Sequence, residues 1–207
     1  MSINELCIKG AAELAAMIRD RKVTSGDVVD AYLARIKEVN PAANAVTVTL
    51  ADQARAAAAA AADKAVAAGE RLGPLAGVPF TIKENVDVKG SATTWGVKAL
   101  AEQIASADAP IVARLREAGG IPLARTNLPD FAFRWDTASG RAGRTRNPWD
   151  ANRTAGGSSG GEAAALASGM TPLGLGNDLG GSLRVPSQIC AARRRCGPHA
   201  GAWRTVP

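Results

Sequence analysis

Two glycine-rich loops carry serines in positions suited to nucleophilic chemistry. The first reads Gly156-Gly157-Ser158-Ser159-Gly160-Gly161 and the second Asp178-Leu179-Gly180-Gly181-Ser182, with an Ala-rich segment between them. Glycine lacks a Cβ, so such loops can turn several N–H groups toward one point. A serine hydroxyl beside those donors could attack a carbonyl whose oxyanion they stabilise. The pattern therefore indicates an active site, and the apolar, helix-forming flanks argue against the alternative, a flexible Gly/Ser linker.

A serine hydroxyl is a weak nucleophile and needs a base within hydrogen-bond reach. The chain has one histidine, His199, close to its C-terminal end, so neither a Ser-His-Asp triad nor a His-rich metal site is expected. The cysteines Cys7, Cys190 and Cys196 lack CxxC spacing, which argues against a zinc ribbon. Lysine remains as the candidate base.

Lys83 differs from the other lysines because it ends the apolar, strand-like run of residues 77–83. A lysine is neutral at pH 7 only where burial or neighbouring charge brings its pKa far below about 10.4. Lys37, Lys64 and Lys98 lie in polar or amphipathic surroundings, and we expect them to be solvated. We expect Lys83 to be buried and to act as the base.

The segments around Lys83 and both serine loops resemble the amidase signature family. The resemblance rests on GVPFTIKENVDVKG (residues 77–90) and TAGGSSGGEAAALASGMTPLGLGNDLGGSLRVPS (residues 154–187), and it runs from about residue 10 to Cys190. It implies a Ser-cisSer-Lys hydrolase of carboxylic amides that uses neither a metal nor an organic cofactor.

The roles of single residues follow from matching positions. Ser182 matches the nucleophile of the family, Ser158 the serine that follows a cis peptide bond, and Lys83 the base. The family's oxyanion donors match the backbone N–H groups of Leu179, Gly180 and Gly181. The N–H of the nucleophile, Ser182, joins them.

Two neighbours of the second loop complete this expectation. Asp178 and Arg184 flank the nucleophile with opposite charge, and we expect them to form a pair that braces the loop. Many family members carry threonine where this chain has Asn177; the asparagine can still donate and accept hydrogen bonds, so we expect an altered network there.

Nucleotide binding is a weaker alternative. Residues 174–180 approximate a GxGxxG fingerprint with one residue too many, and no acidic residue follows Asp178 as a dinucleotide site requires. A phosphate loop of the GxxxxGK[ST] type is also missing from the sequence.

Composition bounds the class of protein. The chain has 207 residues, of which 46% are hydrophobic and 21% charged, which is typical of a globular domain. The apolar runs are too short to span a bilayer, and the N-terminus lacks a secretory pattern. The scattered cysteines indicate a reducing compartment, so we expect a cytoplasmic protein. The net charge of +6 is concentrated in the final stretch without aromatic interleaving, so nucleic-acid binding is not expected.

Hydrophobic periodicity predicts alternating helices and strands, hence an α/β fold with a layered mixed or parallel sheet and surrounding helices. Thr24 and Asp27 could form a capping box at one helix, and Gly69 could end another. We expect Trp95, Trp135 and Trp149 in the core, with the wall of an acyl pocket as the alternative. Helices are predicted over residues 11–20, 26–40, 52–68 and 111–118, and strands over residues 45–50, 77–83 and 121–125.

The C-terminal segment departs from the family pattern. We expect residues 1–190 to be the N-terminal portion of a single amidase domain. We expect residues 191–207 to be an aberrant basic tail that cannot replace the strands and helices that should follow Cys190. Read one base forward, the codons of residues 199–207 can encode Thr-Pro-Gly-Arg-Gly-Val-Pro, which is close to the family pattern. This suggests a frameshift near residues 188–192 with truncation; a natural short form is the alternative.

The resemblance implies hydrolysis of a small carboxylic amide to an acid and ammonia or an amine, and the expected truncation makes the activity of this short chain doubtful. One alternative is the glutaminase-type subunit of a tRNA-dependent amidotransferase, which requires a partner subunit. Another is an inactive truncated remnant or binding module. No membrane or nucleic-acid partner is expected, and a homo-oligomer is left open.

Overall fold

The computed structural model describes residues 3–67, 72–196 and 201–204, which alternate between helices and strands. The α-helices are α1 (Ile3–Cys7), α2 (Ala11–Arg19), α3 (Ser25–Ala43), α4 (Ala51–Ala67), α5 (Pro110–Glu117), α6 (Gly160–Ala167) and α7 (Arg184–Cys190). The strands are β1 (Val46–Thr49), β2 (Pro79–Lys83), β3 (Ile121–Thr126), β4 (Ala138–Ser139), β5 (Gly143–Arg144), β6 (Leu173–Gly176), β7 (Arg193–Cys196) and β8 (Gly201–Arg204).

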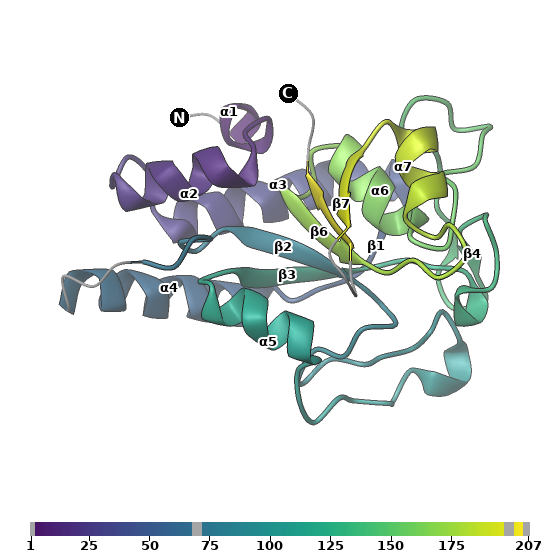
Figure 1. Ribbon diagram of the computed structural model, residues 1–207, viewed down its shortest axis with the longest axis horizontal. Helices are drawn as coiled ribbons and strands as arrows, with labels where there is room; N and C mark the ends of the chain where they lie inside the picture. Colours follow the sequence, from purple (N-terminus) through teal and green to yellow (C-terminus); the bar gives the residue numbers. More distant parts are fainter. Residues whose placement is uncertain (1–2, 68–71, 197–200, 205–207) are drawn as a thin grey trace.

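The main sheet is mixed, with the strand order β1-β3-β2-β6-β8-β7. β2 is parallel to β3 and to β6, whereas β1, β8 and β7 join antiparallel. Helix α4 packs against α3 and β3, α5 packs against β3, and α6 packs against β2 and β6 (Figure 1). The predicted layered α/β fold is confirmed.

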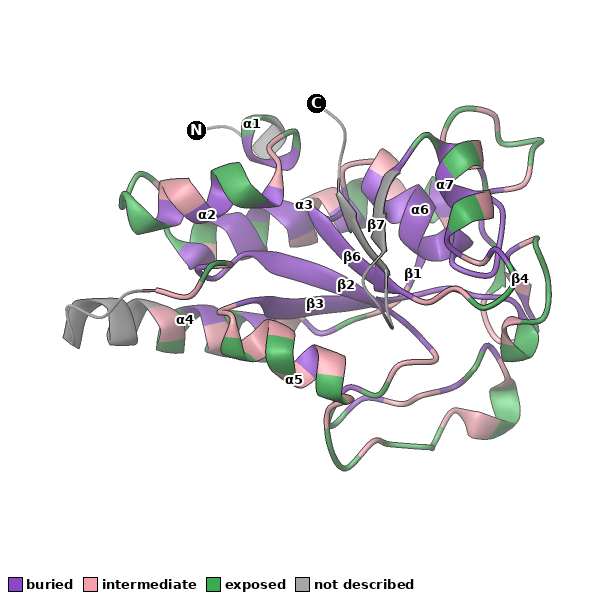
Figure 2. Ribbon diagram, in the orientation of Figure 1, coloured by how far each residue is buried: buried purple, intermediate pink, exposed green. Residues whose placement is uncertain are grey.

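The three central strands are buried along their whole length. Helices on both sides remove β2, β3 and β6 from water, as the continuous buried colour in Figure 2 shows. Because β2 and β6 are parallel neighbours, with Ile82 opposite Leu175, their carboxyl ends meet at one edge of the sheet. The two segments that the sequence singled out, Lys83 and the loop after residue 176, therefore emerge side by side.

Helix α3 begins as the sequence predicts. Asp27 N donates to Thr24 Oγ1 at 3.0 Å, and Thr24 N donates to the Asp27 carboxylate at 2.9 Å, so the capping box is confirmed. The helix continues beyond the predicted end at residue 40 and stops where Asn44 adopts a left-handed conformation. The predicted cap at Gly69 lies outside the described residues.

The C-terminal segment adds two strands to the sheet. Residues 193–196 and 201–204 form β7 and β8, and β8 pairs antiparallel with β6. The outer edge of β6 offers unpaired N–H and C=O groups, which a further strand satisfies. His199 lies outside the described residues.

The expected core positions of three tryptophans are also wrong. Trp95, Trp135 and Trp149 are 37%, 66% and 69% exposed. They lie outside the helices and strands, and two of them use the indole N–H to fix a loop. Trp135 Nε1 donates to Gly180 O and Trp149 Nε1 donates to Cys190 O, each at 3.1 Å.

Within the described ranges, no helix combines the length and apolar character needed to cross a membrane.

Candidate active site

Lys83 is the last residue of β2, and its side chain is completely buried. Its Nζ lies 2.7 Å from Ser158 Oγ and 2.8 Å from Asn177 Oδ1. Ser158 belongs to the first glycine-rich loop and Asn177 directly follows β6. The structure thus brings together the predicted base, the first loop serine and the residue at which this chain departs from the family pattern.

Burial sets the protonation of the Lys83 amine. Removal from water lowers the pKa of Lys83 from its ordinary value of 10.5 to about 7. When ionised, Glu162 and Asp178 oppose this shift, but only in part. A large fraction of the lysine is therefore neutral at neutral pH, and a neutral amine can accept a proton.

The first loop is packed so tightly that only glycine fits at several of its positions. The Gly157–Ser158 peptide bond is cis, as the resemblance implies, and Ser158 is buried. A Cβ on Gly157 would lie 2.5 Å from Arg134 O, and one on Gly161 would lie 2.5 Å from Asn127 N. These close approaches hold the loop, and with it the Ser158 hydroxyl, against the end of the sheet.

The second loop is organised around the carboxylate of Asp178. It accepts from the N–H groups of Gly181, Leu183 and Arg184 at 2.7, 3.1 and 3.1 Å. Arg184 Nε and Nη2 each donate to this carboxylate at 3.0 Å, so the predicted bracing pair is confirmed. The hydrogen bond from Arg184 and those backbone donors hold the pKa of Asp178 well below its usual range.

Ser159 joins the two loops. Its N–H donates to the backbone oxygen of Ser182 at 3.0 Å, and its Oγ donates to the backbone oxygen of Asn177 at 3.3 Å. Ser182 is half-buried, whereas Ser158 is fully enclosed. In the part of the chain that the structure describes, no hydrogen bond joins the Ser158 and Ser182 hydroxyls, so Ser159 is the direct link between their loops.

The backbone donors expected to form an oxyanion site divide into two groups. Among the described residues, the N–H groups of Leu179, Gly180 and Ser182 have no hydrogen-bond partner. The N–H of Gly181 is instead occupied by Asp178, so in this conformation it is not available to an oxyanion. The Leu179 side chain is fully exposed at this loop.

Buried charged residues next to the site, among them Glu162 and Arg125, were missed in the sequence. Glu162 of α6 is completely buried, burial raises its pKa to about 8, and its Oε1 accepts from Leu175 N at 3.0 Å. Arg125 of β3 is also buried and donates to the backbone oxygens of Val86 and Ala92 at 2.6 and 3.1 Å. A single charged residue within a run of small or apolar ones, GGEAAALA or IPLART, was the available signal.

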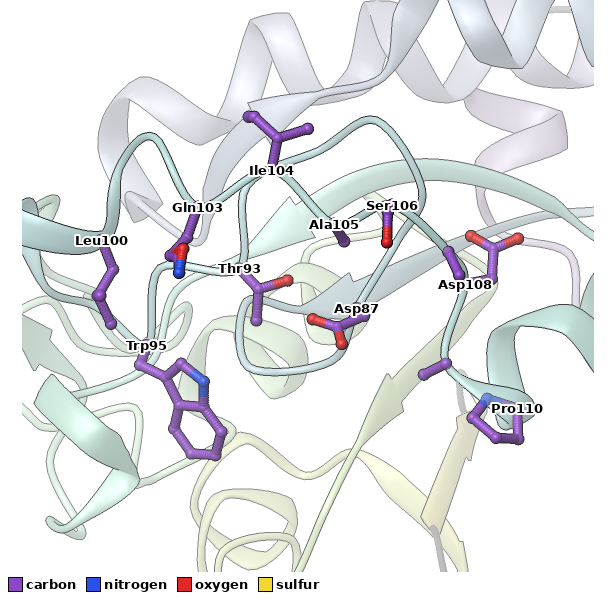
Figure 3. Close-up of a pocket in the computed structure, with 12 residues that line it drawn as sticks. Asp87, Thr93, Trp95, Leu100, Gln103, Ile104, Ala105, Ser106, Asp108 and Pro110 are labelled. Carbon is purple, nitrogen blue, oxygen red and sulfur yellow. The ribbon is translucent and has the colours of Figure 1, made fainter.

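A separate hollow of about 610 Å³ lies in the long connection between β2 and α5. Figure 3 shows Asp87, Thr93, Trp95 and Asp108 among the side chains that surround it. Lys83, Ser158 and Ser182 are not among the residues that line this hollow, so it is not where these groups meet.

Over the described residues, no group of three or more His, Cys, Asp or Glu side chains could hold a metal ion.

The comparisons with known proteins agree with this geometry. The family described as Amidase matches residues 27–192, which is most of the chain. The chain belongs to the amidase family. Its fold also matches a solved bacterial aryl acylamidase of the amidase signature family, with a TM-score of 0.89 and 29% identity over 96% of this chain and 45% of that one.

Relatives within the amidase family have different activities in their names. An indoleacetamide hydrolase from Bradyrhizobium diazoefficiens is 48% identical over 86% of this chain and 34% of its own length. A glutamyl-tRNA(Gln) amidotransferase subunit from Acidothermus cellulolyticus is 46% identical over 90% of this chain and 37% of its own length. The chain thus spans little more than a third of these curated relatives.

Proposed function

We propose that this protein hydrolyses a small carboxylic amide to a carboxylic acid and ammonia or an amine. One observation carries the proposal: a buried lysine with a pKa of about 7 lies 2.7 Å from the hydroxyl of Ser158. A buried lysine is usually a liability for stability, so its placement at the end of a central strand requires a compensating role. General-base catalysis is the role that the adjoining serine loops support.

The proposed reaction begins with a proton relay. Neutral Lys83 accepts the proton of Ser158 Oγ, which in turn takes the proton of Ser182 Oγ. The freed Ser182 oxygen attacks the amide carbon, and the carbonyl oxygen becomes an oxyanion. The unpartnered N–H groups of Leu179, Gly180 and Ser182 are suited to stabilise this charge.

Collapse of the tetrahedral intermediate breaks the C–N bond. The proton held by Lys83 returns through Ser158 to the leaving nitrogen, which departs as ammonia or an amine. Water then attacks the acyl ester on Ser182 by the same relay and releases the acid. We propose that Gly181 contributes to the oxyanion site only if its N–H leaves Asp178, to which it donates at 2.7 Å.

The proposal is tested by incubating the purified chain with linear aliphatic and aryl amides and quantifying the acid and ammonia or amine. Ser182→Ala should abolish product formation, and the exposed Ser106→Ala serves as the matched control. Equal product release by both variants, or none by the unaltered chain, contradicts the proposal. The second result favours the inactive remnant that the sequence left open.

The similarity to the amidotransferase subunit favours one second candidate, a glutaminase that works with a partner subunit. The two candidates differ in their dependence on that partner. Release of ammonia from glutamine only when a copurifying subunit is present supports the glutaminase; hydrolysis of simple amides by the isolated chain supports the amidase.

We further propose a cytoplasmic setting, residues 1–190 as the N-terminal portion of an amidase domain, and a frameshift near residues 188–192. The free thiols of Cys7 and Cys190 support a reducing compartment, and the family match ending at residue 192 supports the boundary. The nucleotide sequence tests the frameshift: a family-like reading frame in the shifted register supports it, and its absence contradicts it.

A further inference from the structure

Three side chains from two adjoining strand ends form a continuous hydrogen-bonded row. Asn85 Oδ1 accepts from Asn177 Nδ2 at 3.1 Å, and Asn177 Oδ1 in turn accepts from Lys83 Nζ at 2.8 Å. Lys83 and Asn85 lie at the end of β2, and Asn177 follows β6, which is parallel to β2. The register of the two strands therefore fixes the spacing of the row.

The hydrogen-bond chemistry gives this row one direction. An amide oxygen only accepts and an amide NH₂ only donates, whereas a protonated or neutral lysine amine can donate to an amide oxygen. If the Asn177 amide were reversed, its oxygen would face Asn85 Oδ1 and its NH₂ would face the Lys83 amine. The contact with Asn85 would be lost, and the NH₂ could then donate to the lone pair of a neutral Lys83. The hydrogen bond to Asn85 therefore favours the orientation in which the Asn177 oxygen faces Lys83.

This direction determines what Lys83 can accept. A neutral amine has two N–H donors and one lone pair, and Asn177 can only occupy a donor. Among the residues that the structure describes, Ser158 Oγ is the other group within hydrogen-bond distance of Nζ, at 2.7 Å. A hydroxyl at position 177 could instead donate to the lone pair and compete with the proton of Ser158.

We propose that Asn177, locked by Asn85, is a positioning residue that keeps the Lys83 lone pair on the Ser158 hydroxyl. The proposal rests on the function proposed above and adds to it a reason for the two asparagines. Asn177 performs this role without bringing a further negative charge to the buried amine, so it fixes the amine in place without holding the proton on it.

The charged groups around Lys83 come from each element packed on it. Glu162 lies on α6, Asp178 follows β6, and Arg125 of β3 donates to the backbone oxygen of Lys83 at 3.4 Å. Glu84, next in the chain, pairs with Arg141 at 3.2 Å. Substitutions at Asn177 leave these groups in place, so a change in the titration of Lys83 reports on the asparagine contact.

The direct test is NMR titration of the lysine ¹³Cε signals, which needs no reaction. Asn177→Asp should raise the midpoint of Lys83 by one pH unit or more, because a carboxylate in place of the amide oxygen favours the ammonium. The control, Asn152→Asp, places the same charge on an exposed loop residue and should leave the midpoint unchanged. An equal midpoint in the Asn177→Asp variant and the unaltered chain overturns the proposal.

The second readout is the pH profile of covalent labelling of Ser182 by a fluorophosphonate. Asn177→Leu should lower the limiting rate about ten-fold or more, since the lone pair is no longer directed, and Asn85→Leu should lower it to a smaller extent. If labelling depends on Lys83 but both variants are labelled as fast as the unaltered chain, the positioning role of Asn177 is overturned and the proposed function stands. If Lys83 responds to Asn177→Asp but Ser182 is never labelled, the proposed function fails while the contact stands.

Discussion

Replacement of Lys83 by methionine should stabilise the fold while it abolishes reactivity. The unfolded chain holds this lysine protonated below a pKa of 10.5, whereas the folded chain holds it protonated only below about 7. Between these values the folded state binds fewer protons, so the lysine's contribution to the free energy of unfolding rises with pH. Methionine fills a similar volume and removes this pH-dependent penalty.

The magnitude follows from the two pKa values. Each pH unit between them corresponds to about 1.4 kcal/mol, so at pH 8 the buried lysine destabilises the folded state by about 3 kcal/mol. Methionine loses the hydrogen bonds to Ser158 and Asn177, worth about 1 kcal/mol each. We expect Lys83→Met to be more stable by about 1–2 kcal/mol at pH 8, and this gain to shrink by about 1.4 kcal/mol per pH unit as the pH rises.

Urea denaturation followed by tryptophan fluorescence near pH 7, 8 and 9 measures this difference. Lys98→Met is the matched control, because Lys98 is exposed and its replacement should leave the pH dependence of stability unchanged. A Lys83→Met variant that is less stable near pH 7 refutes the reasoning. So does a difference between variant and unaltered chain that stays constant from pH 7 to 9.

Three further outcomes are expected. The rate of amide hydrolysis should rise with pH to a midpoint near 7, because Lys83 loses its proton there. Lys83→Arg should be inactive at every pH because guanidinium stays charged, and an active arginine variant contradicts the assignment of Lys83 as the base. Asp178→Asn should slow fluorophosphonate labelling roughly 100-fold, since the loop before Ser182 loses one of two acceptor oxygens and the charge that pairs with Arg184; an unchanged rate argues against a bracing role. Arg125→Met should lower the free energy of unfolding by about 3 kcal/mol or more in urea titrations, because several backbone oxygens lose a buried charged donor; a change under 1 kcal/mol contradicts this.

Features that depend on residues close together in the chain could be predicted from the sequence. The apolar run that ends at Lys83 predicted both strand β2 and the burial of its last residue. The spacing of Thr24 and Asp27 predicted the start of α3, because a capping box involves only neighbouring residues. The glycine-rich runs predicted tight loops, and Gly157 and Gly161 lie where a Cβ would clash.

Features set by contacts between distant segments could not be predicted in this way. The row from Asn85 to Asn177 and Lys83 exists because β2 and β6 are parallel neighbours, a pairing between segments far apart in the chain. Trp135 is exposed because its indole N–H binds Gly180 O at the surface, and aromatic character alone does not reveal such a partner. The strand at residues 201–204 forms on an edge of β6 that composition does not show.

The most direct test of the central claim is the site of covalent labelling. The unaltered chain is treated with a fluorophosphonate near pH 8, digested, and mapped by mass spectrometry. We expect a single adduct on Ser182, lost in Ser182→Ala and strongly reduced in Lys83→Met, because Lys83 contacts Ser158 at 2.7 Å and Ser159 ties that loop to Ser182. An adduct on Ser158 or another serine, or labelling of Ser182 that is indifferent to Lys83, would contradict the proposed relay.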